Sequence, residues 1–304
     1  MSAARPSEGA QHLSPQGRGN LTNLTRENTS RFVQAGDVRV HYHEAGSGPV
    51  LLCIHGGAPG AFGWGNFGRN LPALAAHFRT LVVDLPGYGL SDKPDISGPR
   101  TGFYTRVFVD MLDALGITQA HVLGLATGGS VALKMAIDHP QRVDRLVVIN
   151  APGGLSLFHP GNPQPGSHDY YGGDGPSLEK MRQVVRRVVY DPSLLTEDII
   201  QERYEASIDP AFMAKAPEGR GGTPGQTLEP LWQELHRIQA QTLVVWGRDN
   251  QTLNFDNALF MLHRIPNVRV HIHGRCGLWV PFEKAQEFNS NVIGFLTVPL
   301  QGSP

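Results

Sequence analysis

Short apolar runs recur along the chain and alternate with segments of helical character. The runs are VRVHYHEA, VLLCIHG, TLVVDLPG, AHVLG, RLVVINAPG, TLVVWGRD and VRVHIHG, between residues 38 and 274. Most are nearly continuous in Val, Leu and Ile, which is typical of strands that are buried on both faces. Amphipathic segments between them predict helices, for example at 178–190, 196–207 and 258–264. The pattern therefore predicts an α/β fold whose mostly parallel sheet carries helices on both faces.

Two stretches interrupt this alternation. Residues 1–28 are rich in Ser, Gly, Gln and Asn, and we expect a disordered tail there. Residues 154–236 contain the loop sequences HPGNPQPGSHDYYGGDGP and APEGRGGTPGQ around helical segments. We expect this insertion to form a helical cap over the carboxyl edge of the sheet, where open α/β sheets bind ligands. The core then consists of residues 29–153 and 237–304.

The stretch HVLGLATGGSVALKMA, residues 121–136, predicts a strand, a sharp turn and a helix. A turn of this kind is typical of the G-x-S-x-G motif, in which it presents a serine nucleophile. Gly124 and Gly128 are in place here, but the residue at the apex is Ala126. We therefore expect the strained turn without the hydroxyl that it presents in serine hydrolases.

Composition narrows the classes of partner and cofactor. The chain has 304 residues, and 26 Lys and Arg against 27 Asp and Glu give a formal net charge of −1. This balance favours neither nucleic acid nor an anionic membrane as a partner. Two cysteines, Cys53 and Cys276, make no disulfide framework, and we expect neither a signal peptide nor a membrane-spanning helix. With no metal-ligand spacing, P-loop or dinucleotide fingerprint, we expect a cytoplasmic protein that uses no cofactor.

Several longer stretches together resemble one family. They are TSRFV, VHYHEAG, IHGGAPGAFGWGNFGRN, DLPGYGLSDKP, VYDPSLLTEDIIQERYEA, WGRDN and RCGLWVPFEKAQEFN. In these stretches the chain is similar to the meta-cleavage product hydrolases, α/β-hydrolase enzymes that split C–C bonds in the dienol carboxylates formed by aromatic ring opening. The resemblance runs from about residue 25 to the C-terminus. It implies the α/β-hydrolase fold and a homodimer.

The resemblance also implies a serine, an aspartate and a histidine that act as a proton relay. Carried onto this sequence, the serine position is Ala126, the acid position is Asn250 and the histidine position is Leu278. Because all three side chains differ from the family pattern, we expect no serine-type hydrolysis. We find no secure replacement nucleophile. His273, a few residues before the histidine position, is a possible replacement base.

The remaining pocket positions of the family are largely retained. By resemblance, the backbone N–H groups of Gly57 and Thr127 form an oxyanion hole. Asn66 matches a polar pocket residue, and Trp279 matches an aromatic wall. Arg203 matches the arginine that holds the substrate's carboxylate or dienolate, although a solvated helix arginine is the alternative.

Two further pocket positions depart from the family. Leu125 replaces an asparagine, and Thr252 replaces an apolar wall residue. Together with Ala126 and Leu278, Leu125 predicts an apolar pocket floor that suits a flat ligand.

Three classes of function remain open on the sequence. The main prediction is a non-hydrolytic, cofactor-independent enzyme of secondary metabolism that acts on an ionisable aromatic, quinoid or enol substrate. It would be an oxygenase that uses O₂, or a cyclase or lyase that makes or breaks C–C bonds. The second class is a C–C or ester hydrolase with an unrecognised catalytic set. The third is a ligand-binding protein without catalysis. In each class the expected partner is a small molecule.

Overall fold

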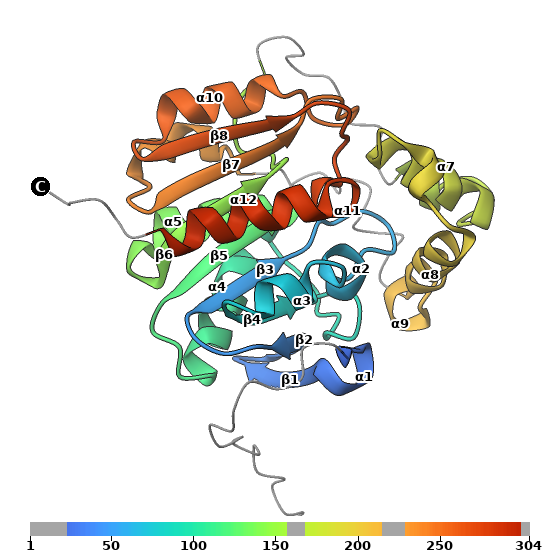
Figure 1. Cartoon of the computed structure of the whole chain (residues 1–304). Coiled ribbons are helices and arrows are strands. Elements are labelled where there is room, and N and C mark those ends of the chain that lie inside the picture. Colours follow the sequence, from blue (N-terminus) through green and yellow to red (C-terminus); the bar gives the residue numbers. More distant parts are fainter. Residues whose placement is uncertain (1–22, 157–167, 215–228, 299–304) are drawn as a thin grey trace, which may run out of the picture.

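The centre of the protein is one eight-stranded sheet with the order β1-β2-β4-β3-β5-β6-β7-β8. The computed structural model describes residues 23–156, 168–214 and 229–298 (Figure 1). Strands β4 to β8 of this order pair in parallel, whereas β2 pairs antiparallel with both β1 and β4. The strands are β1 (Ser30–Ala35), β2 (Val38–Ala45), β3 (Val50–Ile54), β4 (Arg79–Val83), β5 (Ala120–Leu125), β6 (Val143–Ile149), β7 (Gln241–Gly247) and β8 (Val268–His273).

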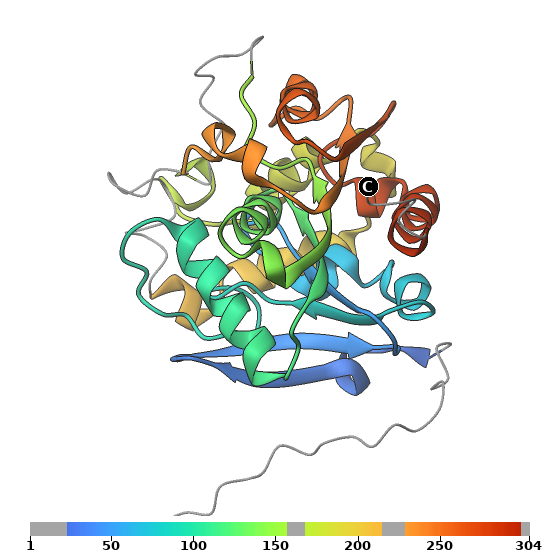
Figure 2. The same ribbon diagram turned by 90° about the vertical axis from the view of Figure 1, so that its left-hand side faces the viewer.

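Helices cover both faces of the sheet, as Figures 1 and 2 show from two directions. One face carries α4 (Arg100–Ala114), α5 (Thr127–Asp138) and α10 (Asp256–Arg264). The other carries α2 (Gly63–Phe67), α3 (Leu71–Ala75), α11 (Val280–Glu283) and α12 (Ala285–Thr297). Each layer buries its own apolar cluster against the sheet, since the central strands are apolar on both faces.

Among the described residues, four α-helices lie between β6 and β7 in the chain, and the last three gather beside one end of the sheet (Figure 1). They are α6 (His168–Tyr171), α7 (Leu178–Val188), α8 (Glu197–Ser207) and α9 (Pro210–Met213). The hydroxyls of Ser177 and Thr196 accept hydrogen bonds from the first turns of α7 and α8, which fixes where these helices begin. The N–H of Trp279 donates to the carbonyl of Val188 over 3.0 Å, so α7 is tied to the segment after β8.

The predicted α/β class and its mostly parallel sheet are confirmed. Each of the apolar runs contains a strand, and β1 is an additional strand that the runs did not predict. β1 is the edge strand and only Ala35 in it is buried, so its sequence lacks the continuous apolar run of the central strands.

Ordered structure begins earlier than the predicted tail boundary. Helix α1 (Arg26–Thr29) starts at a capping box, in which the Asn28 N–H donates to Thr25 Oγ1 and the Thr25 N–H donates to Asn28 Oδ1. The end of the predicted tail therefore forms a short helix, while residues 1–22 lie outside the described residues. Within the described ranges, no helix is both long enough and apolar enough to cross a membrane. The predicted cytoplasmic location stays a prediction.

Candidate functional site

Ala126 stands at the apex of the turn between β5 and α5 with φ 49° and ψ −115°. Residues other than glycine rarely adopt positive φ, so this conformation stores strain. Backbone hydrogen bonds on both sides of Ala126 hold this conformation. The Ala126 N–H donates to the Ile149 carbonyl over 2.9 Å, and the Ala126 carbonyl accepts from the N–H groups of Gly129 and Ser130. The expected strained turn is therefore present, and it presents a methyl group.

The two glycines of the motif allow the backbone to pass through this turn. A Cβ on Gly124 would lie 2.1 Å from the carbonyl oxygen of Gly128. A Cβ on Gly128 would lie 2.2 Å from the carbonyl oxygen of Ile54. Both positions lack room for any side chain, which explains their spacing around Ala126.

Gly57 and Thr127 lie next to each other, as an oxyanion hole requires. A Cβ on Gly57 would be 2.8 Å from Thr127 Oγ1 and 3.1 Å from the hydroxyl of Tyr88. The Tyr88 hydroxyl donates to the Gly57 carbonyl over 2.8 Å and thereby orients the loop after β3. The N–H of Thr127 is the first of α5 and has no partner inside the helix.

Asn250 and Leu278 are joined through Asn150, a residue that the sequence reasoning missed. The side-chain amide of Asn150 donates to the Leu278 carbonyl over 2.8 Å, and its oxygen accepts from Asn250 Nδ2 over 3.2 Å. The oxygen of Asn250 accepts from the N–H and the hydroxyl of Thr252 over 2.9 and 2.8 Å. This network ties together the carboxyl ends of β6, β7 and β8. A polar residue directly after the apolar run of β6 was the available signal for Asn150.

Arg203 is a buried cation from the cap, so the alternative of a solvated helix arginine is wrong. It is 6% exposed, and its guanidinium lies 5.1 Å from the ring centroid of Trp279. Burial lowers its pKa to about 10. Arg203 Nε and Trp279 Nε1 are buried donors without hydrogen-bond partners among the described residues. Two unsatisfied donors beside each other suit an anionic ligand group.

The other predicted pocket residues differ in how they reach the site. Asn66 is buried and its amide donates to the Phe62 carbonyl over 2.8 Å. Leu125 is 1% exposed and packs in the apolar cluster on the α12 face, so it supports the pocket from within the core. The hydroxyl of Thr252 donates a hydrogen bond to the side-chain oxygen of Asn250. Ala126 and Leu278 are half-buried and pack against the same cluster as Leu125, as an apolar floor requires.

Neither cysteine nor histidine supplies an evident replacement catalyst among the described residues. Burial raises the pKa of both the Cys53 and the Cys276 thiol, which disfavours the nucleophilic thiolate. His55 is occupied, because its Nε2 accepts from the Leu85 N–H over 3.0 Å. Nδ1 of His273 lies 3.2 Å from Glu287 on α12. No described contact joins His273 to Ala126, so its role as a base stays a prediction.

Comparison with known proteins identifies relatives over most of the chain. A family model described as alpha/beta hydrolase fold matches residues 49–285. A 2-hydroxy-6-oxo-6-phenylhexa-2,4-dienoate hydrolase of Comamonas testosteroni is 35% identical over 91% of this chain and 99% of its own. A 2-hydroxy-6-oxononadienedioate/2-hydroxy-6-oxononatrienedioate hydrolase of Cupriavidus pinatubonensis is 37% identical over 91% of this chain and 98% of its own.

Solved structures agree with these relatives. A serine-to-alanine mutant of the meta-cleavage product hydrolase of Pseudomonas fluorescens, complexed with acetates, superimposes with a TM-score of 0.78. It shares 30% identity, with 88% of this chain and 97% of that chain covered. A serine hydrolase involved in carbazole degradation gives a TM-score of 0.77 at 27% identity, with 89% of this chain and 99% of that chain covered.

These findings correct the main functional prediction. The relatives named here are hydrolases, and neither an oxygenase, a cyclase nor a lyase is among them. The expectation of a non-hydrolytic enzyme is therefore wrong. It rested on the three positions that the family resemblance assigns to the relay, and it gave too little weight to the strained turn, the adjacent Gly57 and Thr127 and the buried arginine. The chain belongs to the α/β-hydrolase family and resembles its meta-cleavage product hydrolases.

Proposed function

We propose that this protein hydrolyses a C–C bond in a planar, anionic dienol ketone of the 2-hydroxy-6-oxo-dienoate class. The observation that carries the proposal is the pairing of a strained turn with a buried, positively charged side chain. The strained turn at Ala126 lies beside Gly57 and Thr127, and the buried Arg203 lacks a carboxylate partner among the described residues. Relatives with 35–37% identity are named for hydrolysis of such compounds.

The proposed ligand places its anionic end at Arg203 and Trp279. Guanidinium is planar and carries its charge at any ordinary pH, so it matches a carboxylate or an ionised enol. Its pKa of about 10 leaves it protonated near neutrality. The ring of Trp279 stacks on that of Phe282 with centroids 4.3 Å apart, which provides a flat apolar wall for a conjugated chain.

The ketone end of the ligand belongs at the turn. There the N–H groups of Gly57 and Thr127 would stabilise the oxyanion that forms when the carbonyl carbon is attacked. Hydrolysis adds the oxygen of water to this carbon and breaks its bond to the dienol. The electron pair of that bond passes to the dienol fragment, whose carbon takes up a proton, while the other fragment leaves as a carboxylic acid.

The proposal includes a catalytic set without the serine relay. Ala126, Asn250 and Leu278 hold the positions at which the family resemblance expects the serine, the acid and the histidine. A methyl, an amide and an isobutyl group transfer no protons, so we propose direct attack by a water molecule bound beside Ala126. Without a side chain to activate that water, positioning and oxyanion stabilisation must supply the rate enhancement, which in serine hydrolases without their triad is about 10³–10⁴-fold over water.

The test is turnover of 2-hydroxy-6-oxo-6-phenylhexa-2,4-dienoate, followed by loss of its absorbance and by product mass. We expect cleavage about 10³–10⁴ times faster than without protein. Restoring the relay in Ala126→Ser/Asn250→Asp/Leu278→His should raise the rate further, whereas Ala126→Ser alone should not, because its hydroxyl has no base. Binding of the dienoate without any cleavage above background would sink the hydrolase proposal and leave a ligand-binding protein. A rate of the order expected for an intact serine enzyme, about 1–10³ s⁻¹, would contradict the absence of a relay.

The predictions about partners remain open beside this proposal. A small-molecule ligand is part of it, and O₂ has no role in hydrolysis. The homodimer stays a prediction, as does the absence of nucleic acid and membrane partners.

A further inference from the structure

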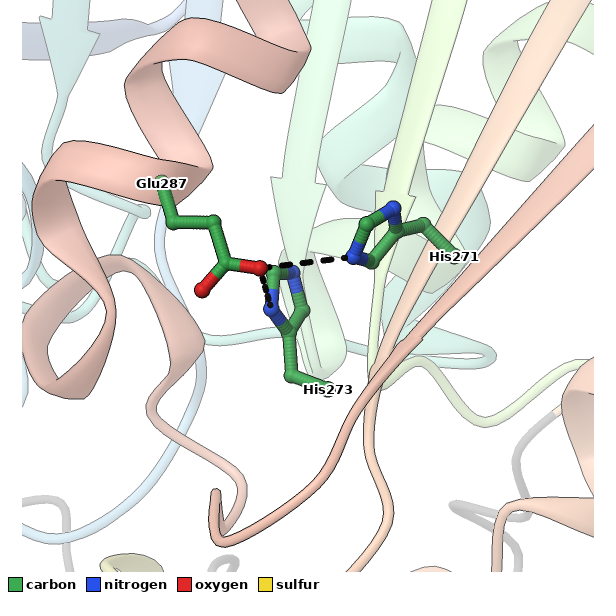
Figure 3. Close-up of side chains that lie close together, drawn as sticks. All are labelled: His271, His273 and Glu287. Atoms are coloured by element: carbon green, nitrogen blue, oxygen red, sulfur yellow. Dashed lines mark ion pairs between the residues drawn. The ribbon is translucent and has the colours of Figure 1, made fainter.

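We propose a transition-metal site on the outer edge of the sheet, formed by His271, His273 and Glu287. One potential ligand atom from each residue lies within 4.8 Å of those of the other two. The two histidines occupy alternate positions on β8 and so share one face of that strand, while Glu287 comes from the first turn of α12 (Figure 3). The proposed hydrolysis uses none of these three residues, although the sequence analysis names His273 as a possible base.

The separations are close to what a bound metal requires. Glu287 Oε1 lies 3.2 Å from Nδ1 of His273 and 3.7 Å from Nε2 of His271. Ligand atoms about 2.0–2.1 Å from a tetrahedral zinc ion are roughly 3.3 Å apart. The carboxylate therefore already lies near both imidazoles, and Figure 3 shows it facing the two rings.

The two exposed side chains of the cluster can move to complete the coordination of an ion. The side chains of His271 and Glu287 are 40% and 56% exposed, so both can rotate at little cost, whereas His273 is 1% exposed and fixed. Glu287 also lines an open surface hollow with Ser290 and Asn291, which gives an ion a path from solvent. Water can complete the coordination on this open side.

The chemistry of the three groups selects the ion. Two imidazoles and one carboxylate suit Zn²⁺, Co²⁺, Ni²⁺ or Cu²⁺, whereas Ca²⁺ and Mg²⁺ prefer oxygen ligands.

The arrangement of the two rings is a second observation beside the ion pairs. The imidazole rings lie together, with centroids 4.2 Å apart. A metal ion bound by Nδ1 of His273, Nε2 of His271 and Glu287 would hold both rings in this arrangement and would fasten the edge strand β8 to α12.

The experiment uses the full chain, freed of any affinity tag and stripped with a chelator, and Co²⁺ as a spectroscopic probe at neutral pH. We expect wild-type protein to bind Co²⁺ with visible absorption bands of a low-coordinate site, and Zn²⁺ to displace it. His271→Ala and Glu287→Gln should each weaken binding by roughly tenfold or more. His263→Ala removes an exposed histidine from α10 and is the matched control, which should bind as wild type does.

Zn²⁺ should also raise the Tm of the wild type and of His263→Ala, but not that of His271→Ala, because ligands of the native state stabilise it. Equal affinity in wild type and His271→Ala, or no binding at millimolar Zn²⁺, would overturn the proposal. Dienoate turnover is measured separately, so failure of the metal site and failure of the proposed hydrolase remain distinguishable.

Discussion

At the scale of single residues, the backbone at Ala126 keeps a conformation that its side chain does not favour. Its φ of 49° is one of three positive values among the described residues other than glycine, beside Asn150 and Arg275. Asn150 lies in the network that joins β6, β7 and β8. Strain of this kind costs about 1–3 kcal/mol and persists where the surroundings impose it. The turn is therefore built into the fold, whichever side chain stands at its apex.

Replacing Ala126 with glycine tests this strain directly. Glycine accepts positive φ freely but loses more entropy on folding, so we expect the free energy of unfolding of Ala126→Gly to stay unchanged or to rise by up to about 1 kcal/mol. Ala132→Gly, inside α5, should instead lower it by about 1 kcal/mol or more. Gly128→Ala should lower it most, by about 3 kcal/mol, since its Cβ would lie 2.2 Å from a carbonyl oxygen. Urea unfolding measures all three, and a loss in Ala126→Gly as large as in Ala132→Gly would show that the turn is unstrained.

At the scale of secondary-structure elements, helix α8 lies directly against the loop after β3. A Cβ on Gly60 would be 1.9 Å from the carbonyl oxygen of Arg203, and Gly60 has φ 64°. This close approach brings the Arg203 side chain to the ring of Trp279, which follows β8. Helix α8 thus supplies the charge of the proposed site, and the other walls of that site come from the core.

Arg203→Ala should therefore weaken binding of an anionic dienoate or aromatic carboxylate by about 1.5–3 kcal/mol, the value of a hydrogen bond to a charged group. Arg203→Lys should recover little, because the ammonium lacks the planar fork of the guanidinium. Arg187→Ala removes an exposed arginine from α7 and should bind as wild type does. Calorimetry measures the three affinities. Equal affinity in wild type and Arg203→Ala would show that the anion binds elsewhere.

At the scale of the whole molecule, the hydrophobic pattern predicted the fold class and most strands. Burial on both faces leaves a signal in every central strand, whereas β1 is an edge strand with little apolar character. The network around Asn150 was missed because it joins residues 100 and 128 positions apart, and spacing along the chain carries no trace of it. Arg203 was located by the stretch that surrounds it, but only the fold shows that it is buried.

The weakest sequence-based step was the inference of a new chemistry from three positions. The family resemblance assigns Ala126, Asn250 and Leu278 to the relay, and a relay is one part of a hydrolytic site. The turn, the adjacent Gly57 and Thr127 and the buried arginine depend on backbone packing across the whole sheet. Relatives that are named hydrolases match this chain over most of its length.

The stability of the whole chain should fall as pH falls from 7 to 5, and His43 on β2 should account for much of this. His43 is 4% exposed, and burial lowers its pKa to about 4, with the neighbouring His41 acting in the same direction. Asp84 and Glu27 act in the opposite direction and raise this pKa, whereas Arg26 lowers it further. In the unfolded chain a histidine titrates near 6.5, so below that pH the unfolded state binds a proton that the native state refuses. The stabilisation is present above pH 6.5 and is lost as pH falls towards 4, by about 2 kcal/mol between pH 7 and 5.

Urea unfolding at pH 7 and pH 5 measures this loss. The difference in the free energy of unfolding should be smaller in His43→Gln than in the wild type, whereas His77→Gln, at an exposed position, should keep the full difference. If His43→Gln and the wild type lose the same free energy of unfolding, His43 is already protonated in the native state at pH 5.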